Sequence, residues 1–451
     1  MSPTDPLRPP TGPETWLFRG IRIVDPATGR DERGDLSLRD GVIVAPGAAP
    51  VGRVVDAAAL TAVPGLIDLH VHLREPGGED AETVASGLQA AARGGFTTVV
   101  AMPNTRPPCD TPGEVAALLR RAAAAAGAEA LPAACITRGR AGHELADLAA
   151  LAAAGAAAFT DDGNVVADAA LMRRALAAAK ALGRPVMQHA LEPTLAGEGV
   201  MHAGAYAQRL GLPGIPAEAE AAIVARDVAL AAETGGAVHV QHLSVRESLP
   251  ALREARRRGL PVSAEATPHH LALCDEDVRF DNPGAFKMNP PLGSRADREA
   301  LLEAVADGTI AALATDHAPH TAAAKARGFL QAPFGVVGLE TAVGVTHQAL
   351  VESGRLPLLE WVRRWTAGPA RVLGRPAPSL QPGQPATCAI LDLATPWTVR
   401  PDEFASRSRN TPFGGWSLRG RALWTFRDGR RLWGPEGSGV RSAECGVRSA
   451  E

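Results

Sequence analysis

The segment VPGLIDLHVH, residues 63–72, decides the fold and points to the chemistry. Side chains alternate between the two faces of a β-strand, so His70 and His72 are expected on one face, and Asp68 with them. Two neutral imidazoles that converge from one strand can chelate Zn²⁺. We expect Asp68 to accept a hydrogen bond that fixes the tautomer of one of these histidines.

Seven further apolar runs of similar length follow this segment, and Ala-, Leu- and Arg-rich stretches separate them. The runs are FTTVVAMPN (96–104), LPAACIT (131–137), GAAAFTDDG (155–163), RPVMQHA (184–190), AVHVQHLS (237–244), PVSAEATPHH (261–270) and TIAALATDHAPH (309–320). Strands that alternate with helices indicate a parallel sheet, and eight of them predict an α/β fold, a (β/α)8 TIM barrel over 61–370.

Polar residues recur where these runs end, which is the active-site edge of such a barrel. They are His70, His72, Asn104, Asp161, Asp162, His189, His242 and Asp316. We expect His239, three residues before His242, to face the other way and pack against helices.

The predicted mouth of the barrel therefore holds four histidines and two aspartates, without a thiolate. This set suits Zn²⁺ or Mn²⁺, and two ions could be held if a carboxylate bridges them. Asp161 and Asp162 precede a glycine, so a turn or helix cap is the alternative there. For His269 and His270 in TPHHL, a catalytic or substrate role and a structural one both stay open.

The two ends of the chain differ from the middle in their sequence pattern. Short alternating segments in 15–60 and again in 371–435 predict a small β-sandwich domain built from both termini. Residues 1–14 are predicted to be a flexible lead. The sequence GVRSAE occurs twice in 436–451, which we expect to be a disordered tail.

The composition is that of a globular protein, with 46% hydrophobic and 21% charged residues, and the net charge of −3 argues against a nucleic-acid surface. The five cysteines form no C-x-x-C pair, so neither a disulfide framework nor a cysteine zinc site is expected. The longest apolar run, 148–159, is too short to span a bilayer. A cytoplasmic location is predicted.

Several motifs in the chain resemble the amidohydrolase superfamily, and more closely the dihydroorotases of the long bacterial type. They are PGLIDLHVHLREPG, GGFTTVVAMPNTRP, FTDDG, TPHHL, FKMNPPL, ATDHAPH, APFG and NTPFGGW. The resemblance implies metal ligation by His70, His72, Asp162, His189, His242 and Asp316. It also implies substrate contacts from Arg74, Asn104, Asn289 and His320.

Lysine usage bears on the subclass. Relatives such as hydantoinases bridge two metals with a carbamylated lysine that ends a barrel strand. This chain has only Lys180, Lys287 and Lys325, and none of them ends the fourth run, where Asp162 stands instead. A carboxylate can replace the carbamate as the bridging anion.

Together these features predict reversible hydrolysis of a cyclic amide. A metal-bound hydroxide would attack the ring carbonyl, and Asp316 would act as general acid and base. The resemblance implies interconversion of N-carbamoyl-L-aspartate and (S)-dihydroorotate in pyrimidine (UMP) biosynthesis. Zn²⁺ is the expected cofactor, with one or two ions per subunit and two favoured. A homo-oligomer is expected, and aspartate transcarbamoylase is a candidate partner.

Two alternatives remain at this stage. Another cyclic amidase, such as a hydantoinase or allantoinase, would share the metal site. A catalytically inactive subunit that only scaffolds aspartate transcarbamoylase would be expected to lose metal histidines, and this chain keeps them.

Overall fold

A closed ring of parallel strands forms the centre of the molecule. The computed structural model describes residues 12–45, 47, 52–125, 127–435 and 446–449. Its eight-stranded sheet has the order β15-β14-β13-β10-β9-β8-β7-β6. The strands are β6 (Leu66–Val71), β7 (Phe96–Ala101), β8 (Glu129–Ala134), β9 (Ala158–Phe159), β10 (Val186–Gln188), β13 (Val238–Val240), β14 (Val262–Ala266) and β15 (Ala312–Leu313). Each overlaps a run predicted from the sequence, so the barrel prediction is confirmed.

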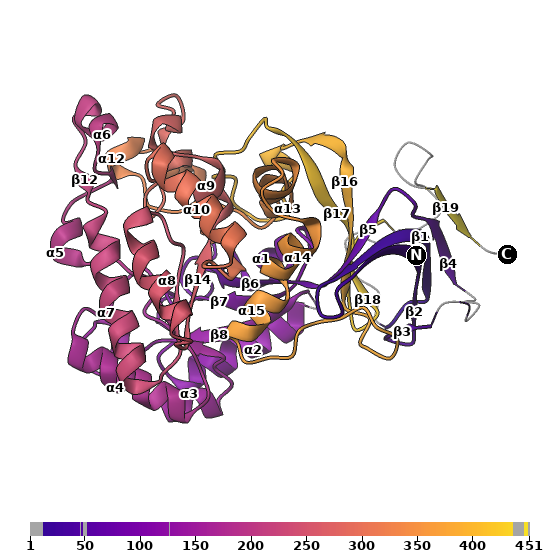
Figure 1. Cartoon of the computed structure of the whole chain (residues 1–451), viewed down its shortest axis with the longest axis horizontal. Helices are drawn as coiled ribbons and strands as arrows, with labels where there is room; N and C mark the ends of the chain where they lie inside the picture. Colours follow the sequence, from indigo (N-terminus) through magenta and orange to yellow (C-terminus); the bar gives the residue numbers. More distant parts are fainter. Residues whose placement is uncertain (1–11, 46, 48–51, 126, 436–445, 450–451) are drawn as a thin grey trace.

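The ring closes where the chain leaves β15. A parallel bridge joins Val71 to His317, and the backbone N–H of His72 donates to the carbonyl of His317 over 2.9 Å. Helices surround the barrel (Figure 1). They are α1 (Val84–Arg93), α2 (Pro112–Ala125), α3 (Leu148–Ala153), α4 (Ala169–Ala181), α7 (Glu218–Thr234), α8 (Leu249–Arg257), α10 (Arg295–Asp307), α14 (Leu358–Trp365) and α15 (Ala367–Val372).

Two apolar layers hold the barrel together. The larger cluster packs the outer faces of the strands against the helices and includes Phe96, Val240 and Trp361. A smaller cluster draws on six barrel strands and forms the packed interior, with Leu69 and Met187 among its members. Because strands buried on both faces must be apolar throughout, these runs lack the polar alternation of a surface sheet.

A nine-stranded sheet built from both ends of the chain forms the second part of the fold. Its strands are β1 (Trp16–Asp25), β2 (Arg30–Arg39), β3 (Val42–Val44), β4 (Arg53–Asp56), β5 (Thr61–Pro64), β16 (Cys388–Thr398), β17 (Ser417–Arg427), β18 (Arg430–Trp433) and β19 (Gly446–Ser449). β5 pairs parallel with β1 and antiparallel with β16, which joins the N-terminal strands to the C-terminal ones. Trp16, Phe18 and Trp424 pack in its core.

The predicted β-sandwich domain is thus confirmed as part of the fold, while two details differ from expectation. β5 lies inside the range assigned to the barrel, yet it belongs to the accessory sheet. Of the tail expected to be disordered, Gly446–Ser449 form β19, which pairs antiparallel with β4. Residues 436–445 and 450–451, and most of the predicted lead, lie outside the described residues.

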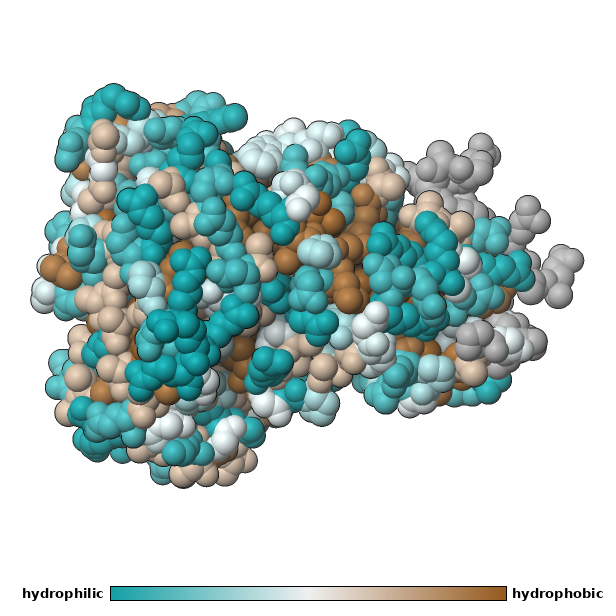
Figure 2. All heavy atoms as spheres, viewed as in Figure 1, coloured by the Kyte–Doolittle hydropathy of each residue, from teal (hydrophilic) through white to brown (hydrophobic). Residues whose placement is uncertain are grey.

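Short elements complete the chain. They are α5 (Pro193–Ala196), β11 (Met201–His202), α6 (Ala205–Leu210), β12 (Gly214–Ile215), α9 (Pro268–Ala272), α11 (Ala322–Lys325), α12 (Gly328–Gln331) and α13 (Ala342–Thr346). Figure 2 shows polar side chains over most of one face, with apolar ones gathered where the barrel meets the β-domain. Among the described residues, no helix combines the length and the apolar character that crossing a bilayer requires.

Candidate active site at the mouth of the barrel

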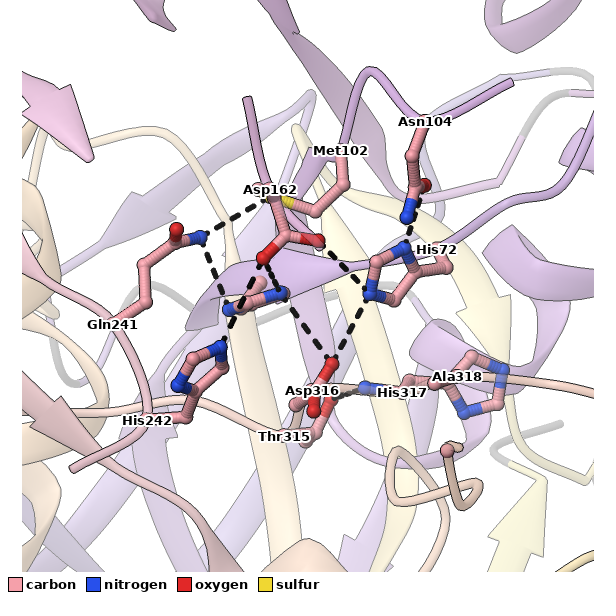
Figure 3. A network of polar contacts seen from close by, with 12 residues as sticks. His72, Met102, Asn104, Asp162, Gln241, His242, Thr315, Asp316, His317 and Ala318 are labelled. Atoms are coloured by element: carbon pink, nitrogen blue, oxygen red, sulfur yellow. Dashed lines mark hydrogen bonds and ion pairs between the residues drawn. The ribbon is translucent and has the colours of Figure 1, made fainter. Parts of the chain in front are cut away.

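Four of the predicted ligands converge from three barrel strands. His70 and His72 come from the end of β6, Asp162 follows β9 and Asp316 follows β15. The His70 Nε2 atom lies 3.1 Å from Asp162 Oδ1 and 3.4 Å from Asp316 Oδ1. The His72 Nε2 atom lies 3.1 Å from Asp316 Oδ1, and Figure 3 shows both carboxylates directed at the His72 ring.

The remaining two predicted ligands meet on the other side of Asp162. His189 follows β10 and His242 follows β13, and their Nδ1 and Nε2 atoms lie 2.8 Å apart. Each of these two nitrogens is 3.8 Å from Asp162 Oδ1. The structure therefore brings together all six residues that the sequence nominated as ligands.

The donor set fits divalent cations. His70, His72 and Asp162 form one group of ligand atoms within 4.8 Å of one another, and Asp162, His189 and His242 form a second. Buried polar atoms normally have hydrogen-bond partners. His70 Nε2 and Asp162 Oδ1 lie 3.1 Å apart, yet neither has hydrogen-bond geometry with the other or with any other described group. Asp162 belongs to both groups, so its carboxylate stands where a bridging ligand would.

Electrostatics favour the metal-binding forms of Asp162 and His189. Burial acts to raise the pKa of Asp162, but the charge of His70 and the nearby His242 imidazole outweigh it and lower the pKa well below its usual value. Burial lowers the pKa of His189 to about 3, and His242 acts in the same direction. An ionised carboxylate beside a neutral imidazole is what a zinc site requires. Burial acts to lower the pKa of His70, but Asp162 and Asp316 outweigh it and raise the pKa well above its usual value, so His70 must release a proton to bind metal.

A buried carboxylate that sequence reasoning missed supports the His70 ring. Glu265 on β14 lies 3.0 Å from His70 Nδ1 through one oxygen and 3.0 Å from His239 Nε2 through the other. Asp68, expected in this role, instead accepts backbone N–H groups of His70 and Thr315. Asp68 thus orients the backbone, whereas Glu265 contacts the ring. A glutamate inside an apolar strand run was the signal available in the sequence.

His239 faces the interior of the barrel, so its predicted packing against helices is wrong. Its neighbours Val238 and Val240 pack outward in the helix-facing cluster, and strand alternation directs His239 inward. Counting three residues back from His242 placed His239 on the wrong face. The alternation of faces holds only within β13, which ends at Val240, and His242 beyond it has a φ of +31°. Gln241, also missed, approaches His70 Nδ1 with its amide nitrogen at 3.2 Å.

The residues predicted to hold substrate lie around one cavity of about 200 Å³ beside the ligands. It is lined by His72, Arg74, Asn104, Asp162, Gly163, His189, His242, Asn289, Asp316, Ala318, His320, Phe334 and Gly335. The sequence had no specific signal for Phe334 and Gly335 beyond the APFG motif. All four predicted substrate residues are therefore brought together with the ligands.

Arg74 offers an unpaired cation to this cavity. Its Nε donates to the carbonyl of Pro319 over 3.1 Å, and its Nη2 lies 3.4 Å from His320 Nε2. Within the described part of the chain, no carboxylate lies in ion-pairing range of Arg74. Burial lowers the pKa of Arg74 to about 10, so it remains charged at neutral pH.

Asn104 and Asn289 each touch a histidine predicted to be a metal ligand. Asn104 Oδ1 lies 2.8 Å from His72 Nδ1, which favours the tautomer that carries its proton on Nδ1 and leaves Nε2 facing the carboxylates. Asn289 Nδ2 lies 3.3 Å from His189 Nε2.

The two histidines of TPHHL are buried outside this cavity. His270 contacts Thr267 Oγ1 at 2.8 Å and the carbonyl of Pro290 at 3.1 Å, next to Asn289. His269 Nε2 is buried without a hydrogen-bond partner.

Backbone conformation is unusual at three of the site residues. Arg74, His242 and Asp316 have φ values of +59°, +31° and +47°. Residues other than glycine rarely adopt a positive φ, and those that do cluster at functional sites.

Comparison with known proteins agrees with this geometry. A profile of the Dihydro-orotase-like family matches residues 60–248. The dihydroorotase of Anaeromyxobacter dehalogenans is 50% identical over 92% of this chain and 97% of its own length, and that of a Geobacillus species is 48% identical over 89% and 95%. The L-hydantoinase of Arthrobacter aurescens, with 22% identity, superposes with a TM-score of 0.84 over 96% of this chain and 98% of its own, which bears on the fold alone. The chain belongs to the dihydroorotase family.

Proposed function

We propose that this protein is a dihydroorotase, which reversibly interconverts N-carbamoyl-L-aspartate and (S)-dihydroorotate in de novo pyrimidine synthesis. The observation that carries the proposal is the juxtaposition of a six-residue histidine–aspartate cluster with a cavity that presents Arg74. A carboxylated cyclic amide needs both features. The near-50% identity to curated dihydroorotases supports the same reaction.

We propose Zn²⁺ as the cofactor, with two ions held by His70, His72, Asp162, His189, His242 and Asp316. The sharing of Asp162 between two groups of ligand atoms supports two ions rather than one. When bound, such ions supply Lewis-acid chemistry, which polarises a carbonyl and makes water more acidic.

The proton transfers are assigned to Asp316. Burial acts to raise its pKa, but His70 and His72 outweigh this and lower the pKa well below its ordinary value, so the carboxylate is ionised at neutral pH. In the hydrolytic direction it accepts a proton from the attacking water and delivers one to the ring nitrogen as the ring C–N bond breaks. In ring closure the same transfers run backward.

Binding of the substrate carboxylate is assigned to Arg74, with Asn104, Asn289 and His320 around it. A guanidinium presents parallel N–H donors that match a carboxylate. Arg74 has no acidic partner among the described residues, so substrate binding would not have to break an ion pair.

The test measures metal content and substrate preference on the same sample. Purified protein is expected to contain zinc, to hydrolyse dihydroorotate far faster than hydantoin or allantoin, and to lose the activity after chelation until zinc is restored. Preference for an uncharged cyclic amide, or full turnover without metal, would contradict the proposal.

Three further predictions concern assembly and location. Homo-oligomerisation is tested by light scattering of the purified chain. Association with aspartate transcarbamoylase is tested by mixing the two proteins and measuring both complex formation and dihydroorotate turnover. The buried free cysteines Cys109, Cys135, Cys274 and Cys388 suit the predicted cytoplasmic location, which fractionation of the source cells would test.

A further inference from the structure

A buried lysine behind the wall of the cavity has no role in the site described so far. Lys325 ends α11, only 6% of its surface is exposed, and it does not line the cavity. Its Nζ atom lies 3.1 Å from the carbonyl oxygen of Lys287, 2.9 Å from that of Pro333 and 2.7 Å from that of Gly335. An ammonium group has three protons, and all three are used.

Two of these carbonyls belong to the segment that forms the cavity wall, residues 333–335. Phe334 and Gly335 line the cavity. The carbonyl of Phe334 lies 2.7 Å from His320 Nε2, and the Lys287 ammonium lies 4.4 Å from the Phe334 ring centroid. Lys325 therefore fixes the carbonyls on either side of Phe334, whose own carbonyl contacts His320.

Close packing around Gly335 leaves residues 333–335 little room, so a small displacement of this segment would alter the cavity wall. Gly335 has a φ of +133°, and a Cβ atom there would lie 2.9 Å from the carbonyl oxygen of Ala318 and 3.0 Å from His320 Nε2. Asn410 reinforces the same place, because its Nδ2 atom donates to the carbonyls of Ala318 and Gly335, each over 3.1 Å. The position of the wall thus depends on contacts from behind it.

The charge of Lys325 also lacks an acidic counterpart. No carboxylate of the described residues lies within ion-pairing distance of its Nζ atom, and the charged groups that act on it are the cations Lys287 and Arg74. The neighbouring His320 is neutral, since burial lowers its pKa to about 3. A buried cation without an anion is costly, and an anionic ligand in the cavity would offset that cost.

We propose that Lys325 is a positioning residue for the carboxylate end of the substrate, holding residues 333–335 against His320 and supplying a positive charge behind the cavity wall. The inference rests on the proposed dihydroorotase function, because it needs an anionic substrate. Burial lowers the pKa of Lys325 to about 7, with Lys287 and Arg74 acting in the same direction. Substrate binding is therefore expected to favour the protonated lysine, and loss of that proton to weaken binding.

The experiment compares KM and kcat for dihydroorotate in the wild-type holoenzyme and in Lys325→Met between about pH 6 and pH 9, which spans the titration of a group with a pKa near 7. The wild-type KM is expected to rise severalfold as the pH increases through about 7. At about pH 6, Lys325→Met is expected to have a KM roughly tenfold above that of the wild type, because a charged hydrogen-bonding group is lost. Its kcat should stay within about twofold of the wild-type value. Its KM should then vary little with pH, and its zinc content should equal that of the wild type.

Lys180→Met is the matched control. Lys180 lies on the exposed side of α4 and donates to the carbonyl of Thr234, so its replacement should leave both constants and the pH profile unchanged. A Lys325→Met enzyme with wild-type KM at pH 6, or with a wild-type KM profile, would overturn the proposal. If that variant does not fold, a wild-type KM that is flat through about pH 7 would overturn it as well. Failure of the dihydroorotase assignment is a different result, because the wild type would then not open dihydroorotate at all.

Discussion

Asp162 holds a central position in the proposed metal cluster. It is the only one of the six proposed ligands that belongs to both groups of ligand atoms. It stands at the end of the fourth barrel run, and the three lysines of the chain lie elsewhere, with Lys180 exposed on α4 and Lys287 and Lys325 behind the cavity. A carboxylate at this position makes the cluster independent of carbon dioxide, which a carbamylated lysine would need.

Asp162→Ala is expected to lower zinc content by at least one ion per chain and to reduce kcat by about a hundredfold or more, as loss of a preorganised catalytic group does. Elemental analysis and dihydroorotate hydrolysis on the same sample provide the measurement. Asp402→Ala, at an exposed position in the β-domain, is the control and should change neither. An Asp162→Ala enzyme with full zinc and full turnover would remove Asp162 from the site.

At the scale of elements, the segment that follows α12 shapes the cavity as much as any strand end does. Residues 333–335 reach the site because the carbonyls of this segment are held by Lys325, Asn410 and His320. Glycine at 335 permits both the φ of +133° and the close approach to Ala318.

Gly335→Ala is therefore expected to displace the cavity wall and to raise KM for dihydroorotate at least tenfold, a cost of about 1.4 kcal/mol in binding. Zinc content should stay unchanged, because residue 335 is not a proposed ligand. Gly383→Ala is the matched control: Gly383 has a φ of +87° and no atom within 4 Å of the added Cβ, so it carries the backbone strain without the crowding. Equal KM values in the two variants would show that crowding at the wall is unimportant.

Local patterns predicted much of this arrangement. Each barrel strand was visible as an apolar run, and each proposed ligand as a polar residue at its end, because parallel strands place those ends on one rim. His239 was misplaced because alternation stops at the positive φ of His242, so counting back from it reversed the face. Glu265 was missed because it lies inside β14 and not at the end of the run, where the polar residues were sought. The contacts of Lys325 and Asn410 join segments far apart in sequence, and no local pattern records them.

For the molecule as a whole, the cluster at the barrel mouth links folding stability to metal. His70, Asp162 and Asp316 are buried together, although His70 Nε2 and Asp162 Oδ1 lack hydrogen-bond partners. A ligand that binds only the folded state stabilises it by about 2.7 kcal/mol at one hundred times its Kd. Chelation is accordingly expected to lower the melting temperature by several degrees, and zinc to restore it. Identical calorimetric transitions with and without metal would contradict a ligand role for the cluster.

The pairing of β5 with β16 sets an order of events during synthesis. Thr61–Pro64 emerges from the ribosome before any barrel strand, whereas its partner segment 388–391 emerges only after all of them. Until then one edge of β5 has no neighbour, and a free strand edge invites association with other chains. A nascent polypeptide whose synthesis stops before residue 388 would leave this edge of β5 unpaired. Binding by chaperones is therefore most important between the synthesis of β5 and that of residues 388–391.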